Sequence, residues 1–467
     1  MGLFGGSILT RGQSSRIQMD GTLHPDFIPV AEALRHQLET SPGGAAVCVY
    51  HRGQSVLDLW GGVKDHKGSP WDHDTMAPSF STTKGVASTL LHMMVDRGLV
   101  RYDDRVAEYW PGFAQAGKER ITIRHVLAHQ SGLYHIRQMI DRADRMLDWP
   151  YMVRAIERAA PLHAPGARSG YHGLTYGYLV GEILQRVTGR SFSRLVQDEI
   201  AKPLQLDGMH VGAPPAVLPR AAELLWPKPG LLQRWVPPTP ELGDRIEKTA
   251  ALIQQALLLV GLDIEVGSLL DALVPRGISS FDFGARQVLR AAIPSANGLF
   301  TARSLARMYA ALANGGELNG VRLLSTDAVK RATQLQGRAP RLAVLPFDMR
   351  WRLGYHAIFT TRGIPRAAFG HFGFGGSGAW ADPSRELAVA MIVNSGMGTP
   401  FGDLRIARIS GAALLSVDRR RQRQRARSAF EPRRFRSPLS EVVGLARPAG
   451  KRAGTPPGRV SAAGARA

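Results

Sequence analysis

Residues 76–91 read MAPSFSTTKGVASTLL, and the other features of the chain are organised around them. A polar, turn-prone lead-in gives way to apolar residues with helical spacing, so the sequence predicts a helix that begins near Ser81. The unpaired N–H groups and the dipole at such a helix start favour negative charge beside the Ser81 hydroxyl. Lys84 follows three residues later, and its amine returns to the same helical face.

This pairing makes Ser81 and Lys84 candidate catalytic residues. A serine hydroxyl is a weak nucleophile until a neighbouring base takes its proton. A buried lysine, whose pKa falls on desolvation, can be that base. The same four residues are also what a helix N-cap followed by a solvated lysine would show. Other parts of the chain must therefore decide between catalysis and simple capping.

Composition and charge restrict the function classes. The chain has 467 residues, 44% apolar and 21% charged, as in soluble globular proteins of two or three domains. Its formal charge is +21, but from Arg419 onward fourteen Lys and Arg face only Glu431 and Glu441. The body is therefore only mildly basic, and we expect no specific nucleic-acid partner. The single cysteine, Cys48, excludes an intrachain disulfide and lies in an apolar run, as a buried thiol would.

The N-terminus carries no recognisable targeting segment. Residues 1–20 look like a flexible leader without a basic n-region or an apolar stretch of signal-peptide length. Gly6 stands where a myristoylation motif needs Ser or Thr. No apolar run reaches the eighteen residues or so of a membrane span. We expect a cytoplasmic protein without a transmembrane segment.

Periodicity and turn residues give a coarse order of elements. Helices are predicted at 27–38, 121–132, 174–188, 302–314 and 404–417, a hairpin at 45–60, and strands at 378–382 and 387–394. Strands thus gather at both ends of the chain with helices between them. This order predicts an α+β fold, in which one antiparallel sheet is built from both chain ends, flanked by helices, and interrupted by an inserted, mainly helical region.

Two boundaries divide this arrangement. Residues 21–417 form the predicted body, whose character changes at about 214–292, where prolines precede the apolar run Ala250–Leu262. That run fits a cap over a pocket or part of the core better than a helix lying on a membrane, because few cations flank it. Residues 418–467 are a basic tail that we expect to be disordered, although weak contact with an anionic surface is an alternative.

Two motifs invite cofactor or metal interpretations that their context does not support. Residues 371–378 read HFGFGGSG, formally a dinucleotide fingerprint, but a strand and a turn follow instead of a helix. Glycines before a strand let a ligand approach the backbone closely, and this interpretation fits better. His125 and His129 are four residues apart without a Glu-containing zinc motif. We therefore expect no cofactor and no metal.

Several motifs stand in a familiar order: Ser81-Thr82-Thr83-Lys84, residues 127–133 (LAHQSGL), Tyr171-His172-Gly173 and His371-Phe372-Gly373. Over roughly residues 25–417 the chain resembles the serine β-lactamase/penicillin-binding-protein superfamily. It is most similar to the class C-like carboxylesterase branch, family VIII. The resemblance implies a β-lactamase-like fold and a serine hydrolase that works through an acyl-enzyme.

The resemblance also assigns roles to individual positions. Ser81 would be the acylated nucleophile, Lys84 its proton acceptor and Tyr171 a proton relay. His371-Phe372-Gly373 takes the place of the family's Lys-Thr-Gly on the strand beside the site. The backbone N–H of Phe374, with that of Ser81, would form the oxyanion hole, so His371, Gly373 and Phe374 are expected oxyanion or substrate-binding residues.

Two departures from the family pattern bear on the substrate. The asparagine that follows Tyr-x is Gly173 here, and His371 and Phe372 replace a lysine and a threonine that engage a substrate carboxylate. A site without these partners favours a small-molecule ester with an apolar acyl group, as a carboxylesterase or lipase would take. A β-lactamase or D,D-peptidase, and a non-catalytic family member, remain alternatives. Retention of Ser81, Lys84 and Tyr171 argues against the last.

Overall fold

The computed structural model describes residues 4–5, 18–226, 266–337, 341–345, 347–396, 398–399 and 402–430. The run Ala250–Leu262, most of the predicted leader and the predicted tail after Phe430 lie outside these residues. The chain divides into two compact units, Met1–Arg420 and Arg421–Ala467. The fold and the site described below belong to the first unit.

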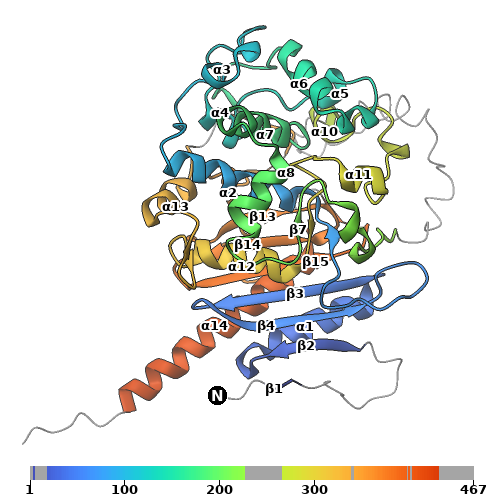
Figure 1. Cartoon of the computed structure of the whole chain (residues 1–467). Helices are drawn as coiled ribbons and strands as arrows, with labels where there is room; N and C mark the ends of the chain where they lie inside the picture. Colours follow the sequence, from blue (N-terminus) through green and yellow to red (C-terminus); the bar gives the residue numbers. More distant parts are fainter. Residues whose placement is uncertain are drawn as a thin grey trace, which may run out of the picture. The chain divides into compact units, whose positions relative to one another are not determined.

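An eight-stranded sheet, in which every neighbouring pair is antiparallel, forms the centre of this unit (Figure 1). Strands from the two ends of the chain meet in its middle, where β3 pairs with β15 from Ala45↔Val393 to His51↔Leu387. The predicted α+β fold with a sheet assembled from both chain ends is thereby confirmed. In spatial order the strands are β1 (Phe4–Gly5), β2 (Met19–Leu23), β4 (Gln54–Gly62), β3 (Gly44–His51), β15 (Leu387–Val393), β14 (Gly378–Asp382), β13 (Phe369–Phe372) and β12 (His356–Ala357).

The two central strands are buried on both faces, and their side chains alternate between two core clusters. Val47 and Val49 of β3 face one cluster, whereas Ala46 and Cys48 face the other. In β15 the larger Val389 and Met391 share a face with the β3 valines, and the alanines at 388 and 390 share the opposite face. This period of two fixes the strand register, because a slip of one residue would exchange the two faces.

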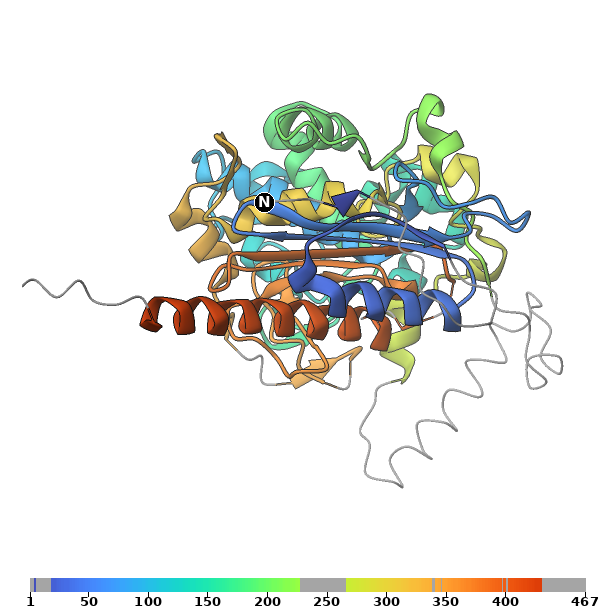
Figure 2. The same cartoon turned by 90° about the horizontal axis from the view of Figure 1, so that it is seen from below.

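Helices cover both faces of the sheet. On the valine face lie α1 (Ile28–Thr40) and the first part of α14 (Leu404–Phe430), side by side in Figure 2. On the alanine face lies α12 (Ala302–Ala313), whose own alanines belong to the same core cluster as those of the strands. Beyond it the helix that follows Ser81, α2 (Thr83–Asp96), is buried over nearly its whole length. Its polar side chains Ser88, Thr89 and His92 are buried as well, and each has a hydrogen-bond partner.

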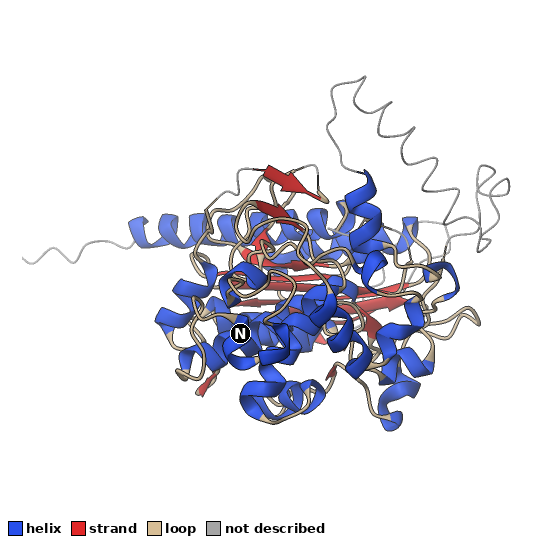
Figure 3. Ribbon diagram, turned by 90° about the horizontal axis from the view of Figure 1, so that it is seen from above, coloured by secondary structure: helices blue, strands red, loops and turns tan. Residues whose placement is uncertain are grey.

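The region inserted between β4 and β12 is mainly helical, as predicted, and Figure 3 shows its helices gathered beside the sheet. Its short strands pair with one another outside the large sheet: β5 (Ala77–Pro78) and β7 (Met209–His210) with β8 (Leu299–Phe300), β6 (Arg168–Gly170) with β11 (Arg341–Ala343), and β9 (Glu317–Leu318) with β10 (Val321–Arg322). Besides α2 and α12 its helices are α3 (Val106–Tyr109), α4 (Ile123–Leu127), α5 (Ile136–Met139), α6 (Trp149–Arg158), α7 (Thr175–Thr188), α8 (Phe192–Leu195), α10 (Val266–Leu273), α11 (Arg286–Arg290) and α13 (Thr326–Thr333). Within the described residues, no helix combines the length and apolar character that crossing a membrane requires.

Two predicted helix ends differ from the structure. The helix predicted for 121–132 is only α4, because the backbone turns left-handed at His129, with φ of 58°, before the predicted stop at Gly132. The closing helix does not end at Val417 but continues as α14 to Phe430, into the predicted tail. Arg385 bonds Asp418 and Arg420 lies 3.6 Å from Asp26, so ion pairs hold the start of this extension to the first unit.

Candidate active site

Ser81 lies at the entrance of the central helix. It belongs to a single 3₁₀ turn, Phe80–Thr82, which leads directly into α2, as the helix-start prediction requires. Phe80 takes a positive φ of 43°, uncommon for a residue with a side chain, and strained turns of this kind often occur at functional sites. One turn further on, a Cβ at Gly85 would come within 2.1 Å of the Tyr309 hydroxyl, so only glycine lets α12 approach α2 this closely.

The Lys84 side chain is fully buried beside Ser81. Its Nζ lies 3.0 Å from Ser81 Oγ, 2.6 Å from the Gly173 carbonyl oxygen and 3.0 Å from the Ser295 carbonyl oxygen. No carboxylate pairs with it among the residues that the structure describes. Because burial without a counter-ion penalises the ammonium, the pKa of Lys84 falls well below its ordinary value of 10.5.

Tyr171 also reaches Ser81. Its hydroxyl donates to Ser81 Oγ at 2.8 Å, and its ring is stacked on Trp351 with centroids 5.7 Å apart and planes inclined by 9°. Burial raises the pKa of the Tyr171 phenol above its usual 10.0, and the bond to Ser81 opposes that rise only in part. The phenol is therefore protonated at neutral pH and acts as a donor.

These contacts define one consistent set of protons. A neutral lysine amine has two N–H bonds and one lone pair, and the two carbonyls take the two N–H bonds. In that neutral form the lone pair faces Ser81 and can accept its hydroxyl proton, whereas an ammonium donates to Ser81 Oγ; Tyr171 donates to the same oxygen in either case. An arrangement of this kind can activate a serine nucleophile and still hold a proton for a leaving group.

The structure also brings the glycine turn after β13 to Ser81. A Cβ at Gly373 would lie 2.4 Å from the Ser79 carbonyl oxygen and 3.2 Å from Ser81 N, so this position needs glycine. Phe374 lines the same cavity as Ser81, and its ring packs on Phe80 with centroids 5.3 Å apart. Neither Ser81 N nor Phe374 N donates a hydrogen bond to a backbone carbonyl of a described residue.

His371 does not line this cavity. Its side chain is 2% exposed and packs behind the Tyr171 ring, with its Nδ1 bonded to the Phe372 carbonyl oxygen at 2.8 Å. Burial lowers the pKa of His371 well below 6.5, and the neighbouring His356 and Lys84 act in the same direction. At neutral pH the residue that takes the place of a family lysine is uncharged, and it supports Tyr171 rather than facing the cavity.

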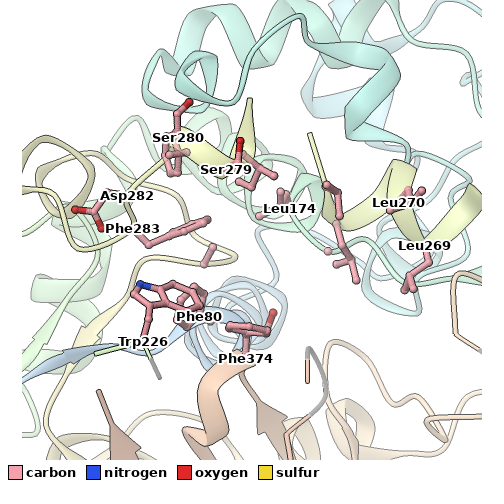
Figure 4. Close-up of a pocket in the computed structure, with 17 residues that line it drawn as sticks. Phe80, Leu174, Trp226, Leu269, Leu270, Ser279, Ser280, Asp282, Phe283 and Phe374 are labelled. Carbon is pink, nitrogen blue, oxygen red and sulfur yellow. The ribbon is translucent and has the colours of Figure 1, made fainter. Parts of the chain in front are cut away.

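A cavity of about 620 Å³ opens at Ser81 and is mostly apolar (Figure 4). Phe80, Trp226 and Phe374 gather on one side of it, and Leu269 and Leu270 of α10 lie on another. Among the described residues that line it, Asp282 is the only charged one. Residues 269–283, in the region of about 214–292 whose change of character was noted in the sequence, supply much of the wall.

Some residues of the site were not singled out from the sequence. Ser295 follows a proline in a turn-forming stretch, a signal for a loop but not for a carbonyl directed at Lys84. Trp351 gave no signal, because nothing local marks it as the ring on which Tyr171 stacks. Leu273 was not singled out either. In the structure its Cδ2 would lie 2.2 Å from a Cβ at Gly173.

The two histidines considered as metal ligands have other partners. His125 Nδ1 bonds Thr122 at the start of α4, and His129 Nδ1 accepts from the backbone N–H of His172. Among the described residues, no three His, Cys, Asp or Glu side chains are grouped as a metal ion requires.

Comparison with known proteins agrees with this geometry. The sequence profile of the family described as Beta-lactamase matches residues 30–414. The Mycobacterium tuberculosis protein named Esterase/beta-lactamase LipL is 37% identical over 354 residues, which are 75% of this chain and 77% of that protein. A penicillin-binding protein homolog from Caulobacter crescentus superposes with a TM-score of 0.73 at 34% identity, and a family VIII carboxylesterase with 0.71 at 29%; each covers 85% of this chain and 99% of its own. Because the profile spans most of the body and full-length structures superpose on it, the chain belongs to the beta-lactamase family of hydrolases.

Proposed function

We propose that this protein is a serine ester hydrolase that acts through an acyl-enzyme on Ser81. One observation carries the proposal: Lys84 Nζ at 3.0 Å and Tyr171 OH at 2.8 Å converge on the same oxygen, Ser81 Oγ. Burial lowers the Lys84 pKa, which favours the neutral amine, and raises the Tyr171 pKa, which favours the protonated phenol. These are the two partners that acyl transfer needs.

The proposed reaction has two halves. Ser81 Oγ attacks the ester carbonyl carbon as its proton passes to the Lys84 amine, and the backbone N–H groups of Ser81 and Phe374 receive the developing oxyanion. The leaving alkoxide takes a proton from Tyr171, which regains one from the Lys84 ammonium. Water then attacks the acyl-enzyme with the same groups in reversed roles, which releases the acid.

The cavity supports an ester with an apolar acyl group. Its walls are largely aromatic and aliphatic, and no lysine or arginine is among the described residues that line it. Arg405, next to the glycine turn, already binds the Asp403 carboxylate and the Gly375 carbonyl oxygen. A substrate carboxylate would therefore enter an apolar cavity without a cationic partner, at a desolvation cost that a neutral ester avoids.

Labelling tests the nucleophile. Intact protein treated with a fluorophosphonate should carry one adduct, on Ser81, by peptide mapping, and Ser81→Ala should carry none. An adduct on another serine of the wild-type protein contradicts the proposal.

Substrate comparison tests the ester assignment. The kcat/KM for p-nitrophenyl butyrate should exceed that for nitrocefin by several orders of magnitude. Comparable values would instead support β-lactamase activity, the second candidate, which the double name of the Mycobacterium tuberculosis relative favours.

A further inference from the structure

His129 combines two unfavourable features next to the proposed site. Its backbone takes a φ of 58°, in the left-handed region that residues with a Cβ rarely adopt. Its side chain is fully buried, and within the described part of the chain its Nε2 has no hydrogen-bond partner. Each feature is unfavourable for the folded state. Such costs persist where the surrounding structure uses the residue for something specific.

The hydrogen bonds of His129 show what that use is. Its backbone carbonyl accepts from the N–H of Gly170 at 2.9 Å, and its ring Nδ1 accepts from the N–H of His172 at 3.1 Å. Gly170 and His172 are the two residues on either side of Tyr171. One residue therefore holds the backbone before and after the proposed proton relay.

The ring of His129 also limits where the phenol can lie. Its centroid is 5.2 Å from that of Tyr171 and 4.1 Å from that of Trp351. Since Trp351 stacks on Tyr171, the three rings form one packed group, from which the Tyr171 hydroxyl extends to Ser81. The left-handed turn at His129 is what lets its carbonyl and its ring face this loop together.

We propose that His129 is a positioning residue that keeps the Tyr171 hydroxyl on Ser81 Oγ, by accepting hydrogen bonds from Gly170 and His172 and by packing against the phenol ring. The inference rests on the proposed function in one respect: Tyr171 must be the proton relay. His129 does not touch the substrate and transfers no proton. It acts through its acceptor atoms, its left-handed backbone and the packing of its ring.

Two substitutions separate these requirements. Asparagine tolerates positive φ, and its side-chain oxygen can accept a hydrogen bond as Nδ1 does. Glycine tolerates positive φ but offers no acceptor. The comparison of His129→Asn with His129→Gly therefore isolates the side-chain acceptor and its packing from backbone strain. His92→Ala is the control for loss of a buried imidazole, because the His92 ring bonds Tyr102 and Leu353 and not the Tyr171 loop.

Steady-state hydrolysis of p-nitrophenyl butyrate is the measurement. Displacement of a reacting group by about 1 Å can cost about a hundredfold in rate. We expect His129→Gly to lower kcat by about 10- to 100-fold with little change in KM, and His129→Asn to stay within about fivefold of wild type. His92→Ala should lower the melting temperature but leave kcat unchanged.

A double-mutant cycle supplies a readout that a general loss of stability would not change. If His129 acts through Tyr171, adding His129→Gly to Tyr171→Phe should lower kcat little further, because the positioned hydroxyl is already absent. Additive losses, or equal kcat for His129→Gly and His129→Asn, would overturn the inference. Should His129→Gly fail to fold, His129→Leu, which keeps volume but has no acceptor, takes its place.

The outcome is distinguishable from failure of the proposed function. If Ser81 is not the nucleophile, wild-type protein shows no fluorophosphonate adduct on Ser81. If only the His129 inference is wrong, Ser81 is labelled and Tyr171→Phe is impaired, whereas His129→Gly turns over like wild type.

Discussion

At the scale of single residues, Lys84 and Tyr171 both contact one oxygen, Ser81 Oγ. Two groups that exchange protons through one atom act as a unit, so removing either should cost nearly as much as removing both. The burial that lowers the Lys84 pKa also raises the Tyr171 pKa, so it favours the neutral amine and the protonated phenol together. The proposed function thus depends on the low dielectric around these two side chains as much as on their identity.

Tyr171→Phe removes only the hydroxyl and keeps the ring stacked on Trp351. We expect kcat for p-nitrophenyl butyrate to fall by about a hundred- to ten-thousandfold, the usual contribution of a general acid or base. Lys84→Ala should lose a similar amount, and the double variant little more. Tyr178→Phe is the matched control, because its buried hydroxyl bonds the Met146 carbonyl oxygen and not Ser81. Near-normal turnover by Tyr171→Phe would place the relay elsewhere.

At the scale of elements, α10 takes the space in which a relative with asparagine after Tyr-x would hold that side chain. A Cβ at Gly173 would lie 2.2 Å from Leu273 Cδ2 and 2.8 Å from the Ala272 carbonyl oxygen. The Gly173 carbonyl also accepts from Lys84 at 2.6 Å. Helix α10 thus fills the space that an asparagine side chain at position 173 would need. It also packs on the loop whose Gly173 carbonyl accepts a hydrogen bond from Lys84.

Gly173→Asn should therefore reduce both stability and activity. The new side chain forces α10 outward, and the Gly173 carbonyl moves away from Lys84. Adding Leu273→Ala should restore part of the melting temperature and of kcat, because Leu273 supplies the nearest clash while the Ala272 carbonyl remains. The two variants are compared by thermal unfolding and butyrate hydrolysis. If Gly173→Asn alone has the melting temperature and the kcat of wild type, α10 does not close this position.

The extent of α14 leads to a truncation experiment. Val417 is fully buried, Asp418 bonds Arg385 and Arg420 lies near Asp26, so the helix is anchored past the end predicted from the sequence. A chain ending after Phe430 should keep the melting temperature and the esterase rate of the full chain. A chain ending after Ser416 should unfold at lower temperature, because it loses the buried valine and both ion pairs. Equal melting temperatures for the two truncations would contradict this account.

At the scale of the whole molecule, buried neutral histidines should make the fold sensitive to acid. Burial lowers the pKa of His92 and His356 to about 4 and that of His172 to about 3, against 6.5 for an ordinary histidine. Below pH 6.5 the unfolded chain therefore takes up protons that the folded chain does not. The contribution of these histidines to the free energy of unfolding is fully present above pH 6.5. It falls as the pH drops toward 4, by up to about 1.4 kcal/mol per pH unit for each histidine.

Urea unfolding at pH 7.5, 6.5, 5.5 and 4.5 measures this dependence. The free energy of unfolding should be level above pH 6.5 and decline below it. His92→Gln, which cannot be protonated, should start from lower stability but decline less steeply, by the contribution of one proton. A free energy that stays level down to pH 5 would show that these histidines do not remain neutral in the folded protein.

The sequence alone predicted those features that depend on neighbouring residues in the chain. Lys84 returns to Ser81 because three residues make nearly one helical turn. The central strand β15 and the hairpin of β3 and β4 follow from their apolar and alternating residues, and α7 ends at Gly189, whose φ of 66° suits glycine. The order of the motifs along the chain was enough to suggest the family, and its fold was then confirmed.

The features that the sequence did not predict depend on contacts between residues far apart in the chain. Tyr171 meets Ser81 across 90 residues of sequence, and no periodicity reports that distance. The same holds for the stacking of Trp351 and the closure of Gly173 by Leu273. The left-handed turn at His129 ended α4 early because its carbonyl and ring bind the Tyr171 loop, a tertiary demand that outweighs local helix preference. Sequence alone thus determined which residues could react, whereas packing in the tertiary structure decided their burial, their pKa values and the shape of the space before them, because each of these depends on neighbours far along the chain.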